Sequence, residues 1–178
     1  MEHFRRIGTV DVAPLVDLLP RLEECWAWNT LRQDAPGSPQ HDTECIYLRM
    51  PVVVDAATIF DSLSVVDWAP MPHMVLQMLI DCVGVLAQLP PARVMLTRLK
   101  YRGVIDRHID QGRYADLTER FHVPIISNPG NLMHCGDEGL AMVAGDVVWF
   151  DKHAEHWCEN LLPETRVHLI VDCWGLHV

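Results

Sequence analysis

Long apolar runs are missing from this sequence of 178 residues. No stretch approaches the roughly 18 consecutive apolar residues that a membrane-spanning helix needs. The opening segment, MEHFRRIGTV, lacks the apolar centre of a signal peptide. We therefore expect no membrane partner and a cytoplasmic location.

Positive charge is also scarce. The chain has 14 Lys and Arg residues against 24 Asp and Glu residues, which gives a formal net charge of −10. The basic residues are scattered and form no stripe that could neutralise successive phosphates. This balance argues against nucleic acid as a partner.

Paired cysteine motifs are absent, although the chain has 6 cysteines. Without a CxxC pair or an export signal, a disulfide framework or a zinc knuckle is a poor description. The sequence predicts reduced and mostly buried thiols. With 49% hydrophobic and 21% charged residues, the chain has the composition of a globular protein, and its length suits a single domain over 1–178.

The first half of the chain has helical patterns and one conspicuous loop. Apolar residues recur at helical spacing over 11–28 and 72–88. Between them, 32–44 is rich in Pro, Gly, Ser and Asp and reads as a surface loop able to cover a site, and 45–54 reads as a strand. We expect 1–92 to form a helical and lid region that packs on a barrel.

From residue 93 onward the texture changes to short β-branched runs broken by turns. This spacing predicts an antiparallel barrel or sandwich, with 93–178 as its core. The expected fold class is therefore mainly β with N-terminal helices.

The motif with the clearest chemistry is HID at 108–110. If it lies in a strand, His108 and Asp110 point to the same face and offer two ligands for a metal. His156, in the segment GDVVWFDKHAEHWCEN, is the strongest candidate for a third ligand. Two histidines and one carboxylate form the facial triad of non-haem Fe(II) oxygenases. Alternatively, Asp110 caps the turn that follows and His108 is a core histidine.

Arg166 supports the metal hypothesis. It lies in TRVHLIVDCW, a strand that is otherwise largely apolar. A guanidinium in such a strand is costly to bury unless it pairs with an anion. The dicarboxylate co-substrate of these oxygenases would provide that anion.

These motifs together resemble the aspartyl/asparaginyl β-hydroxylase family. The resemblance covers about residues 95–174 and rests on HxD at 108–110, RFHVPI at 120–125, GDVVWFD at 145–151, His156 with Asn160, and RVHLIVD at 166–172. It implies a double-stranded β-helix, the cupin-like jelly roll. It also implies Fe(II), with 2-oxoglutarate as co-substrate and O2 as oxidant, in the hydroxylation of an amino acid or side chain.

The resemblance assigns roles to individual residues. It makes His108, Asp110 and His156 the metal ligands, and it favours His156 over the neighbouring His153. Arg166 would hold the far carboxylate of 2-oxoglutarate.

By strand parity Arg120 and His122 share one face, and both could be structural, Arg120 as a surface charge and His122 as a buried histidine with a backbone partner. The resemblance instead brings them near the carboxylates of the co-substrate or the substrate. His168 shares the strand parity of Arg166 and is expected to face the interior as well.

The carboxylate at Asp110 brings the chain closer to the bacterial relatives that act on free proline than to the vertebrate enzymes that lack this ligand. We therefore expect a small-molecule substrate, most simply a free amino acid or another carboxylate-bearing metabolite. Two other functions remain open: hydroxylation of an Asp or Asn residue in a peptide or protein, and a non-oxidative cupin-type metal isomerase or small-molecule-binding protein. The residues leave the oligomeric state open, a homodimer included.

Overall fold

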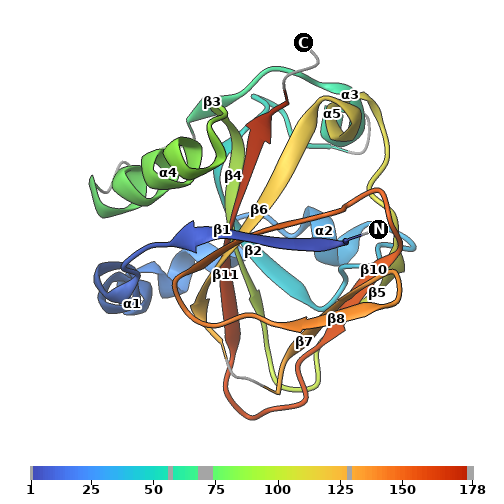
Figure 1. The fold of residues 1–178 in the computed structure, drawn as a ribbon. Helices are drawn as coiled ribbons and strands as arrows, with labels where there is room; N and C mark the ends of the chain where they lie inside the picture. Colours follow the sequence, from blue (N-terminus) through green and yellow to red (C-terminus); the bar gives the residue numbers. More distant parts are fainter. Residues whose placement is uncertain (1, 56–57, 68–73, 128–129, 176–178) are drawn as a thin grey trace.

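The computed structural model describes residues 2–55, 58–67, 74–127 and 130–175. Its strands form two antiparallel sheets (Figure 1). The strands of the larger sheet are β1 (Phe4–Thr9), β2 (Thr43–Met50), β3 (Val66–Asp67), β4 (Pro91–Leu99), β6 (Thr118–Ile126), β9 (Asp146–Phe150) and β11 (Arg166–Trp174). Those of the smaller sheet are β5 (Val104–His108), β7 (Leu132–Cys135), β8 (Glu138–Ala141) and β10 (His156–Glu159). The spatial orders are β1-β9-β6-β11-β4-β2-β3 and β5-β10-β7-β8.

Helices lie on both sides of the larger sheet (Figure 1). The helical elements are α1 (Ala13–Leu18), the 3-10 helix η1 (Leu19–Ala27), α2 (Leu31–Asp34), α3 (Thr58–Asp61), α4 (Met74–Ala87) and α5 (Arg113–Asp116). The helical pattern over 11–28 changes from α to 3-10 at Leu19, because Pro20 has no N–H to continue the α-helical ladder. The expected helix over 72–88 is found as α4; positions 72 and 73 lie outside the described residues.

The first 92 residues contribute more strands than the sequence suggested. β2 pairs with β4, and β1 pairs with β9 at the edge of the larger sheet. The pattern of β1, FRRIGT, gives little strand signal because much of this edge strand is exposed. The N-terminal region is therefore part of the β framework as well as a helical cover.

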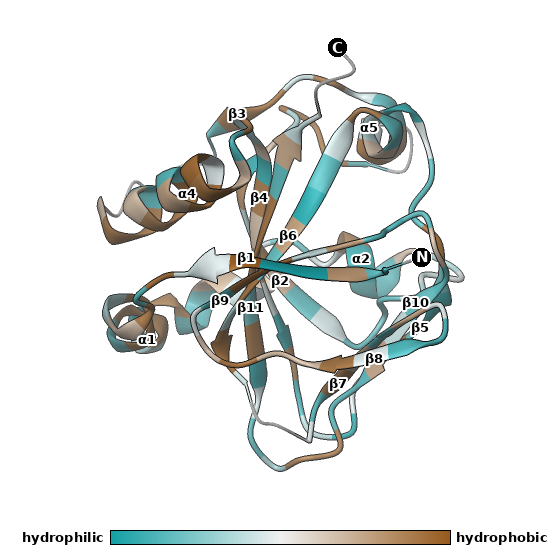
Figure 2. Cartoon of the chain, in the orientation of Figure 1, coloured by the Kyte–Doolittle hydropathy of each residue, from teal (hydrophilic) through white to brown (hydrophobic). Residues whose placement is uncertain are grey.

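Side chains along the central strands alternate between two faces of the larger sheet, one in the hydrophobic core and one with polar and charged residues. In β11 the odd-numbered positions pack with the helices in the main hydrophobic cluster: Val167, Leu169, Val171 and Cys173. The even-numbered positions from 166 to 172 point to the opposite face, and all but one of them are polar or charged: Arg166, His168, Ile170 and Asp172. β6 alternates in the same way, with Phe121 and Val123 in that cluster and Arg120 and His122 on the opposite face. Figure 2 shows the apolar character of the central strands and α4.

The six cysteines are all free thiols, and all but Cys82 are buried. This confirms the expectation of reduced and mostly buried cysteines. Among the described residues, no helix has both the length and the hydropathy of a transmembrane span.

Candidate metal centre

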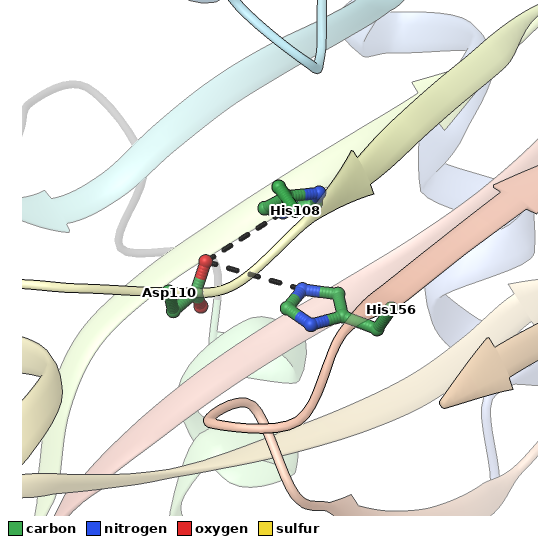
Figure 3. Close-up of side chains that lie close together, drawn as sticks. All are labelled: His108, Asp110 and His156. Carbon is green, nitrogen blue, oxygen red and sulfur yellow. Dashed lines mark ion pairs between the residues drawn. The ribbon is translucent and has the colours of Figure 1, made fainter. Parts of the chain in front are cut away.

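Two histidines and one carboxylate meet at the ends of neighbouring strands in the smaller sheet. His108 ends β5, His156 begins β10, and the two residues are directly paired across these strands. Asp110 lies just beyond the end of β5, where its backbone N–H donates to the carbonyl of Lys152 at 3.0 Å. Its Oδ1 is 3.6 Å from Nε2 of His108 and 3.9 Å from Nε2 of His156 (Figure 3).

The two imidazoles are oriented by the backbone. Nδ1 of His108 lies 2.8 Å from the carbonyl of Asp106, and Nδ1 of His156 lies 3.0 Å from the carbonyl of Ala154. With Nδ1–H donating to these carbonyls, each Nε2 directs its lone pair toward the shared centre. Burial lowers the pKa of His156 to about 4, although Asp110 opposes the shift, so the imidazole is held in the neutral form that binds metals.

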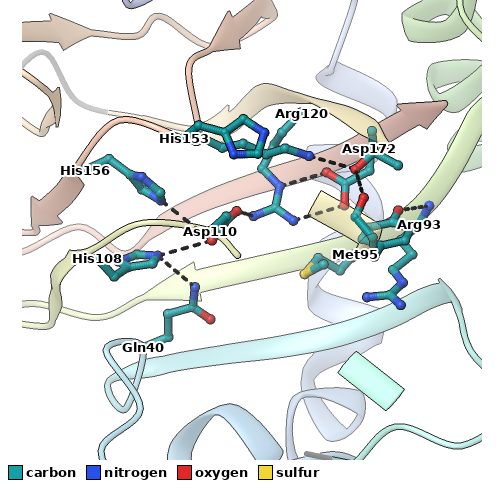
Figure 4. Close-up of polar contacts among 12 residues, drawn as sticks. Gln40, Arg93, Met95, His108, Asp110, Arg120, His153, His156 and Asp172 are labelled. Atoms are coloured by element: carbon teal, nitrogen blue, oxygen red, sulfur yellow. Dashed lines mark hydrogen bonds and ion pairs between the residues drawn. The ribbon is translucent and has the colours of Figure 1, made fainter. Parts of the chain in front are cut away.

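Asp110 is held by a buried network of charges. Nη1 of Arg120 donates to its Oδ2 at 2.5 Å, and the other face of the same guanidinium donates to Asp172 at 2.7 Å and 3.0 Å (Figure 4). Burial alone would raise the pKa of Asp110, but nearby positive charge, chiefly that of Arg120, outweighs it and lowers the pKa to about 2. Asp110 is therefore ionised and has one oxygen directed at the two histidines.

Sequence reasoning missed two members of this network. Asp172 is fully buried in β11. Buried Lys152 donates to the hydroxyl of Thr118 at 2.7 Å, and burial lowers its pKa to about 8. The signal for Asp172 was present in the sequence, since an acidic residue in a largely apolar strand needs a partner just as Arg166 does.

An inner pocket extends from the histidines between the two sheets. Its lining includes His108, His156, Arg120, His122 and Arg166. The structure thus brings together residues that are far apart in the sequence.

Arg166 is the most unusual residue of the inner pocket. Only 6% of it is exposed, and it makes no ion pair with any described residue. Its Nη2 lies 3.2 Å from Nδ1 of His168, which in turn lies 3.1 Å from Nδ1 of His122. Burial and the charge of Arg166 lower the pKa values of both histidines well below the ordinary range, so both are neutral. The guanidinium is therefore a buried cation without a counter-ion among the described residues.

A larger outer cleft opens on the other side of His108 and Asp110. Its cavity volume is about 630 Å³, and its walls come from 31–40, the interior faces of β2 and β4, and the segments around Phe60 and Tyr114. Gln40 also lines it, with Nε2 lying 3.3 Å from Nε2 of His108 (Figure 4). His108 lines both cavities, so the triad lies where they meet.

The chemistry of the donors fits a divalent iron and a dicarboxylate. The ligand atoms of His108, Asp110 and His156 all lie within 4.8 Å of one another. Two imidazoles and one carboxylate leave further coordination positions open, as the Fe(II) facial triad requires. The inner pocket adds the Arg166 guanidinium and the buried hydroxyl of Thr43, and among the described residues the first has no counter-ion and the second no hydrogen-bond partner. An anion with several oxygens would satisfy both groups.

Two residues near the triad take other positions. His153 is exposed, and its backbone N–H donates to Asp151 at 3.1 Å. Asn160 is buried away from the cavities, where its side chain donates to the carbonyls of Leu99 and Glu164 at 2.9 Å and 2.8 Å. Asn160 thereby fixes the turn that leads to Arg166 at the start of β11. Sequence reasoning also missed Thr43 and Gln40, which belong to segments without a recognisable motif.

Several solved structures have a similar fold. The non-heme alpha-ketoglutarate-dependent epimerase SnoN from nogalamycin biosynthesis is 12% identical, with a TM-score of 0.65 over 96% of this chain and 77% of its own. The viral collagen prolyl hydroxylase of Paramecium Bursaria Chlorella virus-1 is 8% identical, with a TM-score of 0.59 over 96% of this chain and 95% of its own. A 2OG-Fe(II) oxygenase family oxidoreductase from Burkholderia pseudomallei is 14% identical, with a TM-score of 0.55 over 96% of this chain and 93% of its own. These likenesses confirm the fold class, a double-stranded β-helix with added helices.

Comparison at the level of sequence families is more specific. No curated protein sequence matches the chain. The profile of the family described as aspartyl/asparaginyl beta-hydroxylase matches residues 71–175, which is more than half of the chain and includes the triad, Arg120, His122 and Arg166. The protein therefore belongs to the aspartyl/asparaginyl beta-hydroxylase family.

Proposed function

We propose that this protein is an Fe(II)- and 2-oxoglutarate-dependent dioxygenase that hydroxylates a C–H bond of a small, carboxylate-bearing metabolite such as an amino acid or a derivative of one. One observation carries the proposal. The His108, Asp110 and His156 donors and the guanidinium of Arg166, which has no counter-ion among the described residues, line two cavities that share His108 as a wall. A metal isomerase has no need of such a buried cation, whereas a 2-oxoglutarate site does.

The residues of the chain have distinct tasks in this reaction. His108, Asp110 and His156 would hold Fe(II), and bound Fe(II), 2-oxoglutarate and O2 together supply the oxidation of the C–H bond. Arg166 would hold the far carboxylate of the co-substrate by a charge-assisted contact. The hydroxyl of Thr43, which lines the same pocket, would donate a further hydrogen bond.

Arg120 acts through another residue. It donates to both Asp110 and Asp172, so its charge is already balanced by two carboxylates. Its task would be to fix the orientation of Asp110 and to keep it ionised, which pre-organises the metal site. His122 is neutral and lines the inner pocket, where it could contact the co-substrate.

The outer cleft supports a small substrate. Its volume of about 630 Å³ lies within the usual range for small-molecule sites. The segment 31–40 forms one wall of the cleft, so part of the predicted lid region borders the metal centre.

Two measurements test the proposal. The protein is titrated anaerobically with Fe(II) and then with 2-oxoglutarate, and the release of succinate is then measured in air. We expect one Fe(II) per chain, 2-oxoglutarate binding that depends on the metal, and slow succinate formation even without substrate. His108→Ala and His156→Ala should lose iron binding, whereas His153→Ala, a matched control from the same segment as His156, should keep it. Tight binding of zinc or manganese with no affinity for 2-oxoglutarate would instead favour the non-oxidative cupin function.

A further inference from the structure

The outer cleft is lined by three arginines, Arg32, Arg93 and Arg120, which differ in the partners of their guanidinium groups. Arg120 is paired with two carboxylates. Arg93 donates to the carbonyls of Ile59, Thr58 and Ser62 at 2.6 Å, 3.3 Å and 2.6 Å, and its guanidinium lies 3.5 Å from the centre of the Tyr114 ring. These contacts use Arg93 to tie α3 to β4. The third arginine, Arg32, lies on α2.

The guanidinium of Arg32 lies among neutral groups. Its Nη2 contacts the sulfur of Met95 at 3.2 Å. Burial raises the pKa values of Cys45 and Tyr47. The charge of Arg32 opposes both shifts, and its hydrogen bond with the Tyr47 side chain also opposes the second. In the part of the chain that the structure describes, Arg32 makes no ion pair. The thioether and the phenol are both neutral acceptors, so the charge of Arg32 has no counter-ion among the described residues and can bind an anion.

Arg32 is anchored at the point where the two cavities meet. It lines both the inner pocket and the outer cleft. The short helix that carries it is fixed at its start, where Asn29 accepts from the backbone N–H of Leu31 at 3.0 Å and Thr30 donates to Asp34 at 2.5 Å. A ligand bound to Arg32 would therefore lie beside the metal centre.

The remaining surface of the outer cleft is strongly apolar. The apolar and aromatic residues of its lining are Leu31, Ala35, Pro36, Pro39, Tyr47, Met50, Ile59, Phe60, Met95, Ile109, Tyr114 and Ala115. Among the described lining residues, the only carboxylate is Asp110, which is already paired with Arg120 and directed at the histidines. The described lining thus offers a cation and an apolar wall but no free carboxylate, so the charge of a substrate ammonium group would have no counter-ion there.

We propose that the outer cleft binds an apolar carboxylic acid whose amino group is absent or acylated, with Arg32 holding the carboxylate. This inference rests on the proposed function and narrows its substrate class. The apolar body of the substrate lies against Met50, Met95 and Ile59, which directs an aliphatic or aromatic C–H bond toward His108 and Asp110. Arg32 excludes neutral analogues, because its charge would then stay unpaired beside a buried ligand.

Anaerobic titration calorimetry on protein saturated with Fe(II) and 2-oxoglutarate tests this inference. The probes are N-acetyl-L-leucine, free L-leucine and N-acetyl-L-leucinamide. Saturating 2-oxoglutarate occupies Arg166, so the probe carboxylate reports on the second cation. We expect N-acetyl-L-leucine to bind at least about tenfold more tightly than either analogue.

Three variants locate the contact. At saturating 2-oxoglutarate, Arg32→Met should weaken N-acetyl-L-leucine binding by about tenfold or more, and Arg32→Lys should recover part of the loss. Arg49→Met is the matched control, since Arg49 comes from the adjoining strand but pairs with Asp67 and lies outside both cavities. It should bind the probe like the wild type.

The outcomes separate this inference from the proposed function. Three results would overturn the role of Arg32 and the substrate class. They are equal binding of the three probes, no binding of any probe, and unchanged affinity for N-acetyl-L-leucine in Arg32→Met. Succinate release and 2-oxoglutarate binding are measured without any probe, so their failure counts against the proposed function instead. Because Arg32 makes no ion pair among the described residues, its Met variant should fold, and Arg32→Lys provides a charged variant should it fail to do so.

Discussion

Replacing Arg166 with Met should have opposite effects on co-substrate binding and on stability. A desolvated, charge-assisted contact between a guanidinium and a carboxylate is worth about 2 to 5 kcal/mol when one partner is truncated. Loss of the lower figure weakens 2-oxoglutarate binding by about thirtyfold. The stability of the unliganded protein should nevertheless rise, because Arg166 is 6% exposed and makes no ion pair with a described residue.

The size of the gain follows from the surroundings of Arg166. Met fills a similar length with apolar atoms and removes the desolvation cost of a cation, on the order of several kcal/mol, while the charge-assisted contact with His168 at 3.2 Å, worth about 1.5 to 3 kcal/mol, is lost. A net gain of about 1 to 2 kcal/mol corresponds to a rise in Tm of about 2 to 8 °C for a chain of this size. A structural arginine would show a fall.

Thermal unfolding with and without 2-oxoglutarate, in the presence of Fe(II) and the absence of O2, measures both effects. At 2-oxoglutarate equal to 100 times the wild-type Kd, ligand binding stabilises the wild type by about 2.7 kcal/mol, and a thirtyfold weaker variant by only about 0.9 kcal/mol. Arg49→Met, on the exposed side of β2, should change neither quantity by more than about 1 kcal/mol. A variant with lower Tm and the wild-type response to 2-oxoglutarate would refute the assignment of Arg166.

Two further predictions concern buried ionisable groups. Asp172→Asn removes a fully buried carboxylate that accepts two hydrogen bonds from the Arg120 guanidinium. In chemical denaturation this variant should lower the free energy of unfolding by about 3 kcal/mol, and it should also weaken Fe(II) binding. The surface control Asp67→Asn should lower the free energy of unfolding by less than about 1 kcal/mol. Burial and the charge of Arg166 hold the folded-state pKa values of His122 and His168 well below the ordinary histidine value of about 6.5. The unfolded state therefore takes up their protons first, and stability falls as the pH drops below about 6.5. Replacing both histidines with Gln should flatten the dependence of Tm on pH between about pH 7 and 5. The control His153→Gln, at an exposed position, should leave this dependence steep. An unchanged slope in the double variant would contradict the buried neutral state of His122 and His168.

The sequence by itself determined which chemistry the protein has available. The HxD motif and His156 supplied two imidazoles and a carboxylate. Arg166 was marked by its place in a largely apolar strand, since burial of a guanidinium demands an anion whatever the fold. The alternation of β11 was also readable, because side chains two apart in a strand share a face and the apolar ones belong to the core.

The local sequence pattern predicted the secondary structure of the lid region only in part. The segment from 32 to 44 was readable as an irregular stretch from its Pro and Gly content, but the short helix α2 within it was not. Edge strand β1 was missed because much of it is exposed, so it has little apolar alternation to detect. Its place beside β9 depends on chain segments about 140 residues apart.

Only the tertiary structure decided which charges are paired. The sequence alone does not say which of Arg32, Arg49 and Arg120 has a carboxylate partner. The order of strands sets Arg120 between Asp110 and Asp172, and it pairs Arg49 with a carboxylate on the neighbouring strand β3. Arg32 is left facing the cleft among neutral groups. The physical reason is that an ion pair depends on distances of a few ångströms between distant segments, and the strand order that fixes those distances is a property of the whole sheet.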